Sequence, residues 1–251
     1  NSHVTFENKF DLVLSNNAFA HIIDIHDVVK GVNHVLKPNG EFIFEVHYLK
    51  SLIVENQWDN IYHEHIYYYS LTALNNIFKQ YDMTIIDYEI IPIHSGSIRV
   101  TVSNSKQETP QKVLDKIDLE SVTICDLSYL TQYSIDVKQH ISDFNKMFYN
   151  LGKNVIGYGA SGRGTVIMNY CGIDSKYLDY VVDDAPQKVG FYTPGTRLEI
   201  KSWDYVLENG FPDYIVLFAW SFTDEVIKKR QDFIENGGKF IIPLPTLTLQ
   251  P

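Results

Sequence analysis

The sequence is poor in cysteine and has no membrane-length hydrophobic run. Its 251 residues include two cysteines, Cys125 and Cys171, and neither belongs to a Cys-x-x-Cys pair. A zinc ribbon within this chain is therefore excluded, and two reduced thiols are expected of a cytoplasmic protein. No apolar run reaches the ~18 residues of a membrane span. The N-terminus also lacks the basic-then-apolar pattern of a secretory signal.

The sequence lacks an excess of positive charge as well. Its formal net charge is −10 at pH 7, whereas a general nucleic-acid binder is usually basic. A nucleic-acid partner is therefore disfavoured. The hydrophobic and charged fractions, 45% and 21%, are those of a globular protein, and the length suffices for one large domain or two small ones.

The first part of the chain alternates between strand and helix patterns. Residues 10–15 predict a buried parallel strand and residues 27–36 a helix that ends at a Lys-Pro-Asn-Gly stop, before a second strand over 41–48. Such a βαβ unit predicts an open, doubly wound sheet. A helix over 71–81 with Ser70 as its N-cap and a hairpin of two strands follow, as in class I methyltransferase sheets. The hairpin strands are 83–93 and 97–103.

The second part repeats this architecture. A linker with a broken helix is expected over 106–123, and a long helix over 126–151. We predict a partial Rossmann-like domain over 1–105, a linker and bridging helix over 106–152, and a second Rossmann-like α/β domain over 153–251. The expected strands of this second domain are 155–158, 178–182, 213–219 and 239–242, and its expected helices are 162–170, 202–208 and 223–235.

Polar side chains follow the first two predicted strands. Ligands of such sheets lie beyond the carboxyl ends of the strands. Ser15, Asn16, Asn17 and His21 come after the first strand, and His47 lies at the end of the second. These positions are candidates for cofactor contacts, although any single histidine can also be structural.

The run Tyr62-His63-Glu64-His65 is unusually dense in groups that move protons or hold developing charge. In an extended segment His63 and His65 face one way, and Tyr62 and Glu64 the other. General acid–base chemistry is the favoured interpretation. A polar loop is one alternative. A metal site of His63 and His65, with His21 or Glu64 as third ligand, is another, but the helical spacing of a metalloprotease motif is missing.

A glycine-rich turn opens the second domain. Gly159-Ala160-Ser161-Gly162-Arg163-Gly164 lies between a strand and a helix, where backbone N–H groups favour a phosphate and Arg163 can add a charge-assisted contact. The spacing is not that of a dinucleotide fingerprint or a P-loop, which disfavours an NAD-dependent oxidoreductase. A tight turn in which glycine only relieves packing is the structural alternative.

With these motifs in order, the chain resembles the S-adenosylmethionine-dependent C-methyltransferases that act on nucleotide-linked deoxysugars. Members of that family have an N-terminal zinc module, a methyltransferase domain and a Rossmann-like C-terminal domain that helps to hold the nucleotide sugar. The resemblance implies that this chain is the second half of the methyltransferase domain plus the C-terminal domain, and that zinc belongs only to the absent module. The matching segments are residues 15–22, 61–65 with 69–70, 157–160 with 169–172, and 218–222.

The resemblance also implies a mechanism. A base removes a proton from the carbon next to a sugar ketone, donors stabilise the enolate, and the carbon attacks the methyl group of S-adenosylmethionine. His65 is the expected base, Glu64 tunes a histidine, and Tyr62 and His21 donate to the oxygen. The expected cofactor contacts are Ser15, Asn16 and Asn17, and the expected contacts to a dTDP-type sugar are Gly159, Ala160, Ser161, Arg163 and Trp220.

The expected half sheet exposes a parallel edge. A missing N-terminal segment or a second copy in a homo-oligomer is therefore expected to cover it. The glycine-rich cofactor loop of the family is also absent from this chain. A non-catalytic nucleotide-sugar binding module is accordingly the alternative function.

Overall fold

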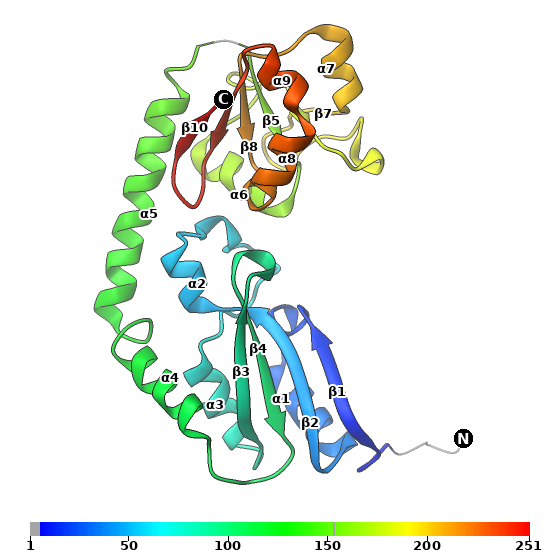
Figure 1. Cartoon of the computed structure of the whole chain (residues 1–251), viewed down its shortest axis with the longest axis vertical. Helices are drawn as coiled ribbons and strands as arrows, with labels where there is room; N and C mark the ends of the chain where they lie inside the picture. The colour runs from blue at the N-terminus through cyan, green and yellow to red at the C-terminus, as the bar shows by residue number, and fades with distance from the viewer. Residues whose placement is uncertain (1–5, 153) are drawn as a thin grey trace. The chain divides into compact units, whose positions relative to one another are not determined.

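A computed structural model describes residues 6–152 and 154–251 and divides the chain into two compact units. Unit 1 comprises the chain up to Val54 and from His63 to Tyr133; unit 2 comprises Glu55–Tyr62 and Ser134–Pro251. Each unit has its own sheet and helices (Figure 1). The α/β fold predicted from the sequence is therefore confirmed.

The sheet of unit 1 has the order β1-β2-β4-β3. Strand β1 (Phe10–Asn16) pairs in parallel with β2 (Leu36–His47), and helix α1 (Ile25–Val35) connects them. Strands β3 (Thr84–Ile91) and β4 (Ser97–Ser103) form the antiparallel hairpin, with β4 against β2. The predicted βαβ unit and hairpin are confirmed.

Strand β1 lies at the edge of this sheet and is not buried as predicted. Its side chains Leu12 and Leu14 are 47% and 63% exposed, because β1 pairs with β2 on one side only. The expectation that the half sheet exposes a parallel edge is therefore confirmed. What covers that edge stays a prediction.

The core of unit 1 is aromatic. The ring centroids of Phe19 and Phe44 lie 4.6 Å apart, and those of Phe42 and Phe44 lie 4.9 Å apart. Helix α3 (Leu71–Lys79) packs into this core through its buried side chains. Its N-cap is Ser70, whose Oγ accepts the Ala73 N–H at 3.0 Å, as predicted.

The segment predicted as a linker contains an unbroken helix, α4 (Gln111–Ser121). Pro110 precedes its first residue, where proline is compatible with a helix because the first N–H groups have no partner within the helix. Helix α4 belongs to unit 1 and buries Val113 and Glu120 completely. The prediction of a broken helix was wrong because it placed Pro110 inside the helix.

The sheet of unit 2 has the order β10-β9-β8-β5-β6-β7 and is parallel except for β10. Strands β7 and β10 were not predicted, because two or three residues carry no readable periodicity. The strands are β5 (Val155–Tyr158), β6 (Val181–Val182), β7 (Ile200–Lys201), β8 (Tyr214–Leu217), β9 (Lys239–Ile242) and β10 (Thr248–Gln250).

The remaining helices follow the predicted order, except that α2 (Leu49–Val54) was not predicted and one predicted helix is divided. The predicted helix over 223–235 divides at Arg230, whose backbone leaves the helical region (φ −114°, ψ 41°). The elements are α2 (Leu49–Val54), α5 (Leu127–Phe148), which contributes residues to both units, α6 (Gly162–Cys171), α7 (Trp203–Asn209), α8 (Thr223–Lys229) and α9 (Gln231–Glu235), with short 3-10 turns η1 (Phe19–His21), η2 (Trp58–Asn60), η3 (Ile93–Ser95), η4 (Pro186–Lys188) and η5 (Trp220–Phe222).

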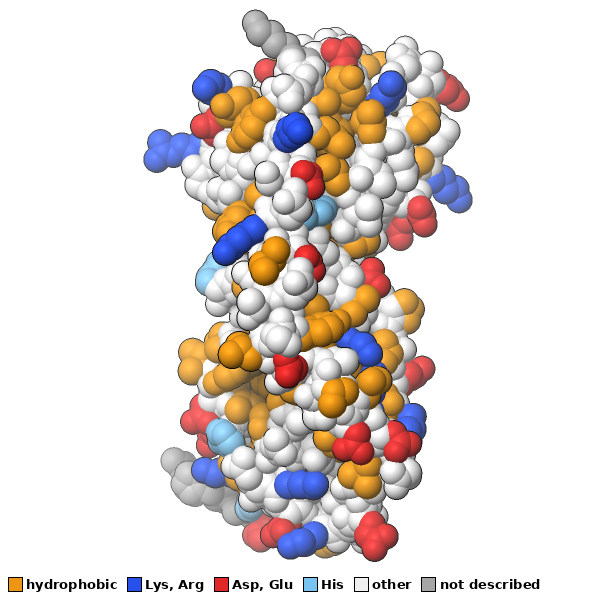
Figure 2. Space-filling model, turned by 90° about the vertical axis from the view of Figure 1, so that its left-hand side faces the viewer, with side chains coloured by type: hydrophobic (Ala, Val, Ile, Leu, Met, Phe, Trp, Pro, Cys, Tyr) orange, Lys and Arg blue, Asp and Glu red, His pale blue; other side chains and the backbone are white. Residues whose placement is uncertain are grey.

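The surface is mixed in character. Figure 2 shows one face, on which hydrophobic side chains lie between charged side chains of both signs. Across residues 6–152 and 154–251, no helix combines the length and the apolar character that crossing a bilayer requires.

Candidate active site

Three histidines meet at the carboxyl ends of β1 and β2 in unit 1. His21 ends η1, His47 ends β2, and His65 lies on the following loop. The ring centroid of His65 is 5.0 Å from that of His21 and 5.1 Å from that of His47. His65 and His47 are buried, whereas His21 is exposed. The cluster thus combines two sheltered imidazoles with one that solvent or a ligand can reach.

Backbone hydrogen bonds place His65 in this cluster. The Ile66 N–H donates to the Ala20 carbonyl at 2.9 Å, and the Leu49 N–H donates to the Tyr69 carbonyl at 2.9 Å. The segment on either side of His65 is therefore fixed to the polypeptide that follows β1 and to the polypeptide that follows β2. This is the edge of the sheet at which ligands bind in such folds.

The tautomer of His21 follows from its partner. Its Nδ1 lies 2.8 Å from the backbone carbonyl oxygen of Glu64. A carbonyl oxygen only accepts hydrogen bonds, so Nδ1 carries the proton and donates. In neutral His21 the Nε2 atom consequently has a free lone pair and can accept a proton. The expected role of His21 as a donor toward substrate therefore requires the protonated ring.

The run 62–65 does not form the extended segment that the alternation predicted. Residues 62–64 bend, His63 is exposed and His65 is buried, so the two histidines do not share one face. The Glu64 side chain is exposed, and its contact to His21 is made by its backbone oxygen. Tyr62 belongs to unit 2. The structure thus brings His21, Glu64 and His65 together within unit 1.

The expected cofactor contacts lie at the end of β1. Ser15 and Asn16 pair with Phe44 and Glu45 of β2. Asn17 adopts a left-handed backbone (φ 49°) and its N–H donates to the Glu45 carbonyl at 3.0 Å. The buried Oδ1 of Asn17 has no hydrogen-bond partner within the described part of the chain. A buried acceptor of this kind suits an amino or hydroxyl group of a bound cofactor.

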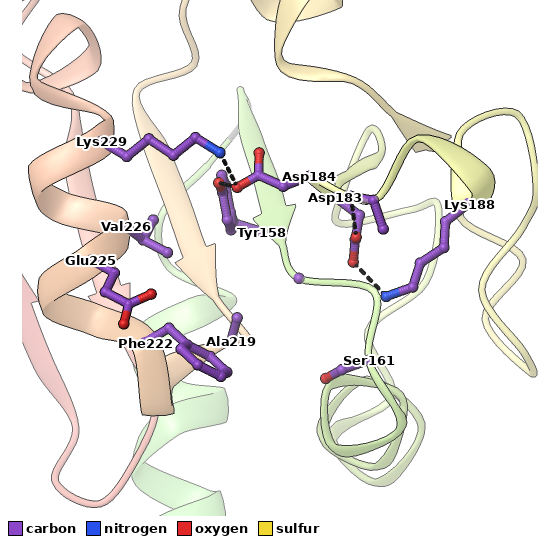
Figure 3. A pocket seen from close by; sticks show the side chains of 12 residues that line it. Tyr158, Ser161, Asp183, Asp184, Lys188, Ala219, Phe222, Glu225, Val226 and Lys229 are labelled. Carbon is purple, nitrogen blue, oxygen red and sulfur yellow. Dashed lines mark hydrogen bonds and ion pairs between the residues drawn. The ribbon is translucent and has the colours of Figure 1, made fainter. Parts of the chain in front are cut away.

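A pocket of about 510 Å³ lies wholly within unit 2. It opens where strands β5, β6 and β8 end (Figure 3). The chain runs from β5 to β6 on one side and later to β8 on the other, which is the topological switch point that binds ligands in open α/β sheets. Its lining residues are Tyr158, Gly159, Ser161, Asp183, Asp184, Ala185, Lys188, Ala219, Phe222, Glu225, Val226 and Lys229.

Asp183 lines this pocket and accepts a hydrogen bond from the glycine-rich turn. Its Oδ2 accepts the Ala160 N–H at 2.8 Å and the Lys188 ammonium at 3.0 Å, and its Oδ1 accepts the Ala185 N–H at 2.9 Å. The Ala160 amide, expected to bind phosphate, is thus already hydrogen-bonded. The Lys188 ammonium remains part of the pocket wall (Figure 3).

Asp184 is the centre of a second charged group. Its carboxylate accepts the Tyr158 hydroxyl at 2.6 Å and the Lys229 ammonium at 2.7 Å, and it pairs with the buried Arg230. Burial by itself raises the pKa of Asp184, but the hydrogen bonds from Lys229 and Tyr158 and the charge of Arg230 outweigh it, so the pKa is lowered. Burial and the bond to Asp184 raise the pKa of Tyr158.

Of the five predicted sugar contacts, Gly159 and Ser161 line the pocket. Ala160, Arg163 and Trp220 are not among its lining residues. Arg163 and Trp220 donate to Asp59 instead. Sequence reasoning assigned no role to Asp183, Asp184, Lys188 or Lys229. The sequence did contain a signal for the two aspartates. They directly follow a strand and lie about 20 residues beyond a glycine-rich turn, and an acidic residue at that position binds sugar hydroxyls in Rossmann-like folds.

Within the described residues, no three or more histidine, cysteine or acidic side chains are grouped so that they could hold a metal ion. His63, one of the metal ligands considered from the sequence, is exposed and lies on the turn that precedes the buried His65.

Known proteins resemble the chain along most of its length. A family model described as "C-methyltransferase C-terminal domain" matches residues 92–245, and one described as "Methyltransferase domain" matches residues 1–88. The chain is 34% identical over 240 residues to C-methyltransferase NovU of Streptomyces niveus. The match covers 93% of this chain and 57% of that protein, so the chain spans little more than half of its relative.

Solved structures give weaker similarities. A putative methyltransferase of Haloferax volcanii, in complex with the Trm112 activator, matches with a TM-score of 0.35 and 14% identity over 41% of this chain and 57% of that one. A putative S-adenosylmethionine-dependent methyltransferase of Listeria monocytogenes matches with a TM-score of 0.33 and 17% identity, over 43% and 66% of the two chains.

Proposed function

The chain belongs to the C-methyltransferases, a family of S-adenosylmethionine-dependent enzymes, and on that premise we propose that it methylates a carbon next to a ketone of a nucleotide-linked deoxysugar. The observation that carries the proposal is the histidine cluster of His21, His47 and His65 at the carboxyl edge of the sheet. Removing a proton from carbon next to a ketone requires a positioned base of near-neutral pKa, which histidine provides.

In this proposal His65 takes the proton. Its sheltered ring lies against His21, which presents a basic Nε2 when neutral and a second N–H donor when protonated. The C–H bond of the sugar breaks, its electron pair forms the enolate, and the negative oxygen is stabilised by an imidazolium or phenol donor. The new C–C bond then forms on that carbon, and the proton stays on the histidine pair until solvent removes it.

When bound, S-adenosylmethionine would supply the electrophilic methyl group, and its sulfur–methyl bond would break in exchange for the new C–C bond, leaving S-adenosylhomocysteine. Ser15, Asn16 and Asn17 are the residues of this chain proposed to contact it, and the buried Asn17 Oδ1 is the atom best suited to accept a hydrogen bond from it. In this proposal these residues form one part of the cofactor site.

We assign the nucleotide part of the substrate to the pocket of unit 2. Its volume of about 510 Å³ is within the usual range for ligand sites. Asp183 and Asp184 offer carboxylate acceptors for sugar hydroxyls, and Lys188 and Lys229 offer cations for a diphosphate. Gly159 and Ser161, two of the residues expected to bind the sugar nucleotide, line the same space.

Two measurements on the longest form of the protein that its gene encodes test this function. The first is mass spectrometry of a dTDP-ketosugar after incubation with S-adenosylmethionine, and a gain of one methyl group is expected. The second is calorimetric titration with dTDP and with S-adenosylhomocysteine, and binding of both is expected. Failure of both ligands to bind contradicts the proposal.

Matched lysines on helix α8 locate the nucleotide site. Lys229 lines the pocket, whereas its neighbour Lys228 does not. Lys229→Gln is expected to weaken dTDP binding about tenfold or more, the usual effect of losing a charge-assisted hydrogen bond. Lys228→Gln is expected to leave it unchanged. Equal effects of the two substitutions contradict the assignment to this pocket.

A non-catalytic nucleotide-sugar binding module is the second candidate. The observation in its favour is that residues 158–229 alone build the whole pocket. This function predicts dTDP binding without methyl transfer, even in the longest form of the protein. Detection of a methylated sugar excludes it.

A further inference from the structure

Asp59 is a buried carboxylate of unit 2 to which neither the comparisons nor the sequence assigned a role. It lies on the short turn η2 and is 0% exposed. Arg163 holds it with two hydrogen bonds, Nε to Oδ2 at 2.9 Å and Nη2 to Oδ1 at 2.8 Å. The Trp220 indole N–H adds a third, to Oδ2 at 2.7 Å. The fold thus supplies this buried carboxylate with three hydrogen bonds, two of them from a cation.

The donors around Asp59 are themselves fixed. The Arg163 guanidinium lies over the Trp220 ring, with its Cζ 4.4 Å from the ring centroid, and its Nη1 donates to the Ser221 hydroxyl at 3.1 Å. One face of the guanidinium lies on the Trp220 ring, and its Nε, Nη1 and Nη2 all donate hydrogen bonds, so Arg163 has little freedom to turn toward a ligand. The network joins η2 to the first turn of α6 and to η5, three elements far apart in the sequence.

Tyr62 is the second residue after η2. The Ile61 N–H donates back to the Trp58 carbonyl at 3.1 Å, which carries the rigid turn up to Tyr62. The Tyr62 ring lies against Gly162, because a Cβ built on that glycine would be 3.6 Å from its Cε2, 3.7 Å from its Cζ and 3.8 Å from its hydroxyl oxygen. Gly162 is the residue before Arg163. The helical turn that binds Asp59 therefore also supports the Tyr62 ring.

We propose that Asp59 is a positioning residue, which holds the Tyr62 phenol against the first turn of α6 through its pairing with Arg163 and Trp220. This inference rests on the proposed function, with Tyr62 in the role expected from the sequence, as a donor toward the substrate oxygen. It gives Arg163 and Trp220 a role different from the sugar contact expected from the sequence. Their charge and N–H groups orient Asp59, and Asp59 orients the turn that ends at Tyr62.

Hydrogen exchange tests the anchoring without any turnover. Asp59→Asn keeps the shape of the side chain but places an amide N–H₂ against the donors of Arg163 or Trp220. Peptides covering residues 55–62 are expected to exchange about tenfold faster or more, whereas other segments of unit 2 keep their protection. The matched control is Glu208→Gln on the exposed surface of α7. Unchanged exchange of residues 55–62 in Asp59→Asn overturns the proposal.

Trp220→Phe serves if Asp59→Asn does not fold. This substitution deletes the indole donor and retains an aromatic ring over Arg163. A smaller acceleration in the same peptides is expected. Acceleration spread evenly over the whole unit overturns the proposal, since it would mean that the network only stabilises the fold.

Turnover tests whether the anchoring acts through Tyr62. Tyr62→Phe is expected to lower kcat about 100-fold by removing the phenol donor. Trp220→Phe alone is expected to lower kcat and leave KM unchanged. In a protein that already carries Tyr62→Phe, the same substitution is expected to lower kcat little further, because the phenol that Trp220 helps to position is gone. Additive losses overturn the proposal. Absence of methyl transfer by the wild-type protein counts against the proposed function alone, because hydrogen exchange decides the anchoring independently.

Discussion

Gly159 of the turn between β5 and α6 lies in close contact with Ala219 at the end of β8. A Cβ on Gly159 would be 2.6 Å from the Ala219 Cβ and 2.8 Å from its nitrogen, and the glycine has a φ of +101°. The space at this point of the pocket wall therefore admits only glycine, for steric as well as backbone reasons.

Gly159→Ala is accordingly expected to destabilise unit 2 and to distort its pocket. A matched control exists in Gly210, which has a similar φ of +98° but no atom within 4 Å of its Cβ position. Both substitutions cost the backbone strain of an L-residue at positive φ. Gly159→Ala should cost about 1–3 kcal/mol more in urea unfolding, because of overpacking. Equal losses would show that Ala219 moves aside without cost.

Substitutions of His65 and His21 in unit 1 test which histidine is the base. His65→Asn is expected to lower kcat by about 10²-fold or more while nucleotide binding stays nearly intact, because a base acts in the chemical step. Equal loss of binding and turnover would mean that His65 is structural.

At His21 two substitutions separate the two ring nitrogens. Asparagine places its amide nitrogen near the position of Nδ1, so His21→Asn is expected to keep the hydrogen bond to the Glu64 carbonyl and remove only Nε2. Glutamine reaches the Nε2 position and loses that bond. If Nε2 takes part in proton transfer, both variants lose activity in kcat. If His21 only fixes the loop, His21→Asn retains activity, as a steady-state assay will show.

Glu120 is expected to be a stability determinant of unit 1. Its Oε1 accepts the Tyr48 hydroxyl at 2.7 Å and the Leu71 N–H at 3.0 Å, and its Oε2 accepts both the N–H and the hydroxyl of Thr72. Glu120→Ala leaves these donors unpaired in the interior and should lower the free energy of unfolding by about 3 kcal/mol. The exposed Asp118→Ala on the same helix is the control, and a similar loss there would contradict this role.

His140 predicts a pH dependence of the stability of unit 2. Burial lowers its pKa from 6.5, and the hydrogen bond of its Nε2 to the Pro243 carbonyl, 2.7 Å long, offsets only part of this. The unfolded chain therefore binds the proton more readily, so the contribution of His140 is present above about pH 6.5 and is lost as the pH falls toward its folded pKa.

Urea unfolding between pH 5 and pH 8 measures this dependence. His140→Gln places an amide N–H near the carbonyl without a titrating group. A shallower loss of stability below about pH 6.5 is expected in that variant. The same slope in both proteins would assign the pH dependence to other groups.

Much of the fold was predictable because its signals are local. The apolar spacing of α3 and its Ser70 cap depend on neighbours within a few residues, and so does the end of α6 at Gly172, which has a left-handed conformation. The prediction was wrong where a residue's effect depends on its position in the fold. Pro110 precedes a helix instead of breaking one, and β1 has the composition of a buried strand but lies at an edge.

By itself the sequence determined the order of the longer strands and helices, the family and the run that contains His65. The tertiary structure decided which side chains meet. His21 meets Glu64 across 43 residues, and Asp59 meets Arg163 and Trp220 across 104 and 161 residues. Periodicity and capping are properties of a short segment, whereas pairing a buried charge or fixing a tautomer depends on atoms that only the packed chain brings within hydrogen-bonding distance.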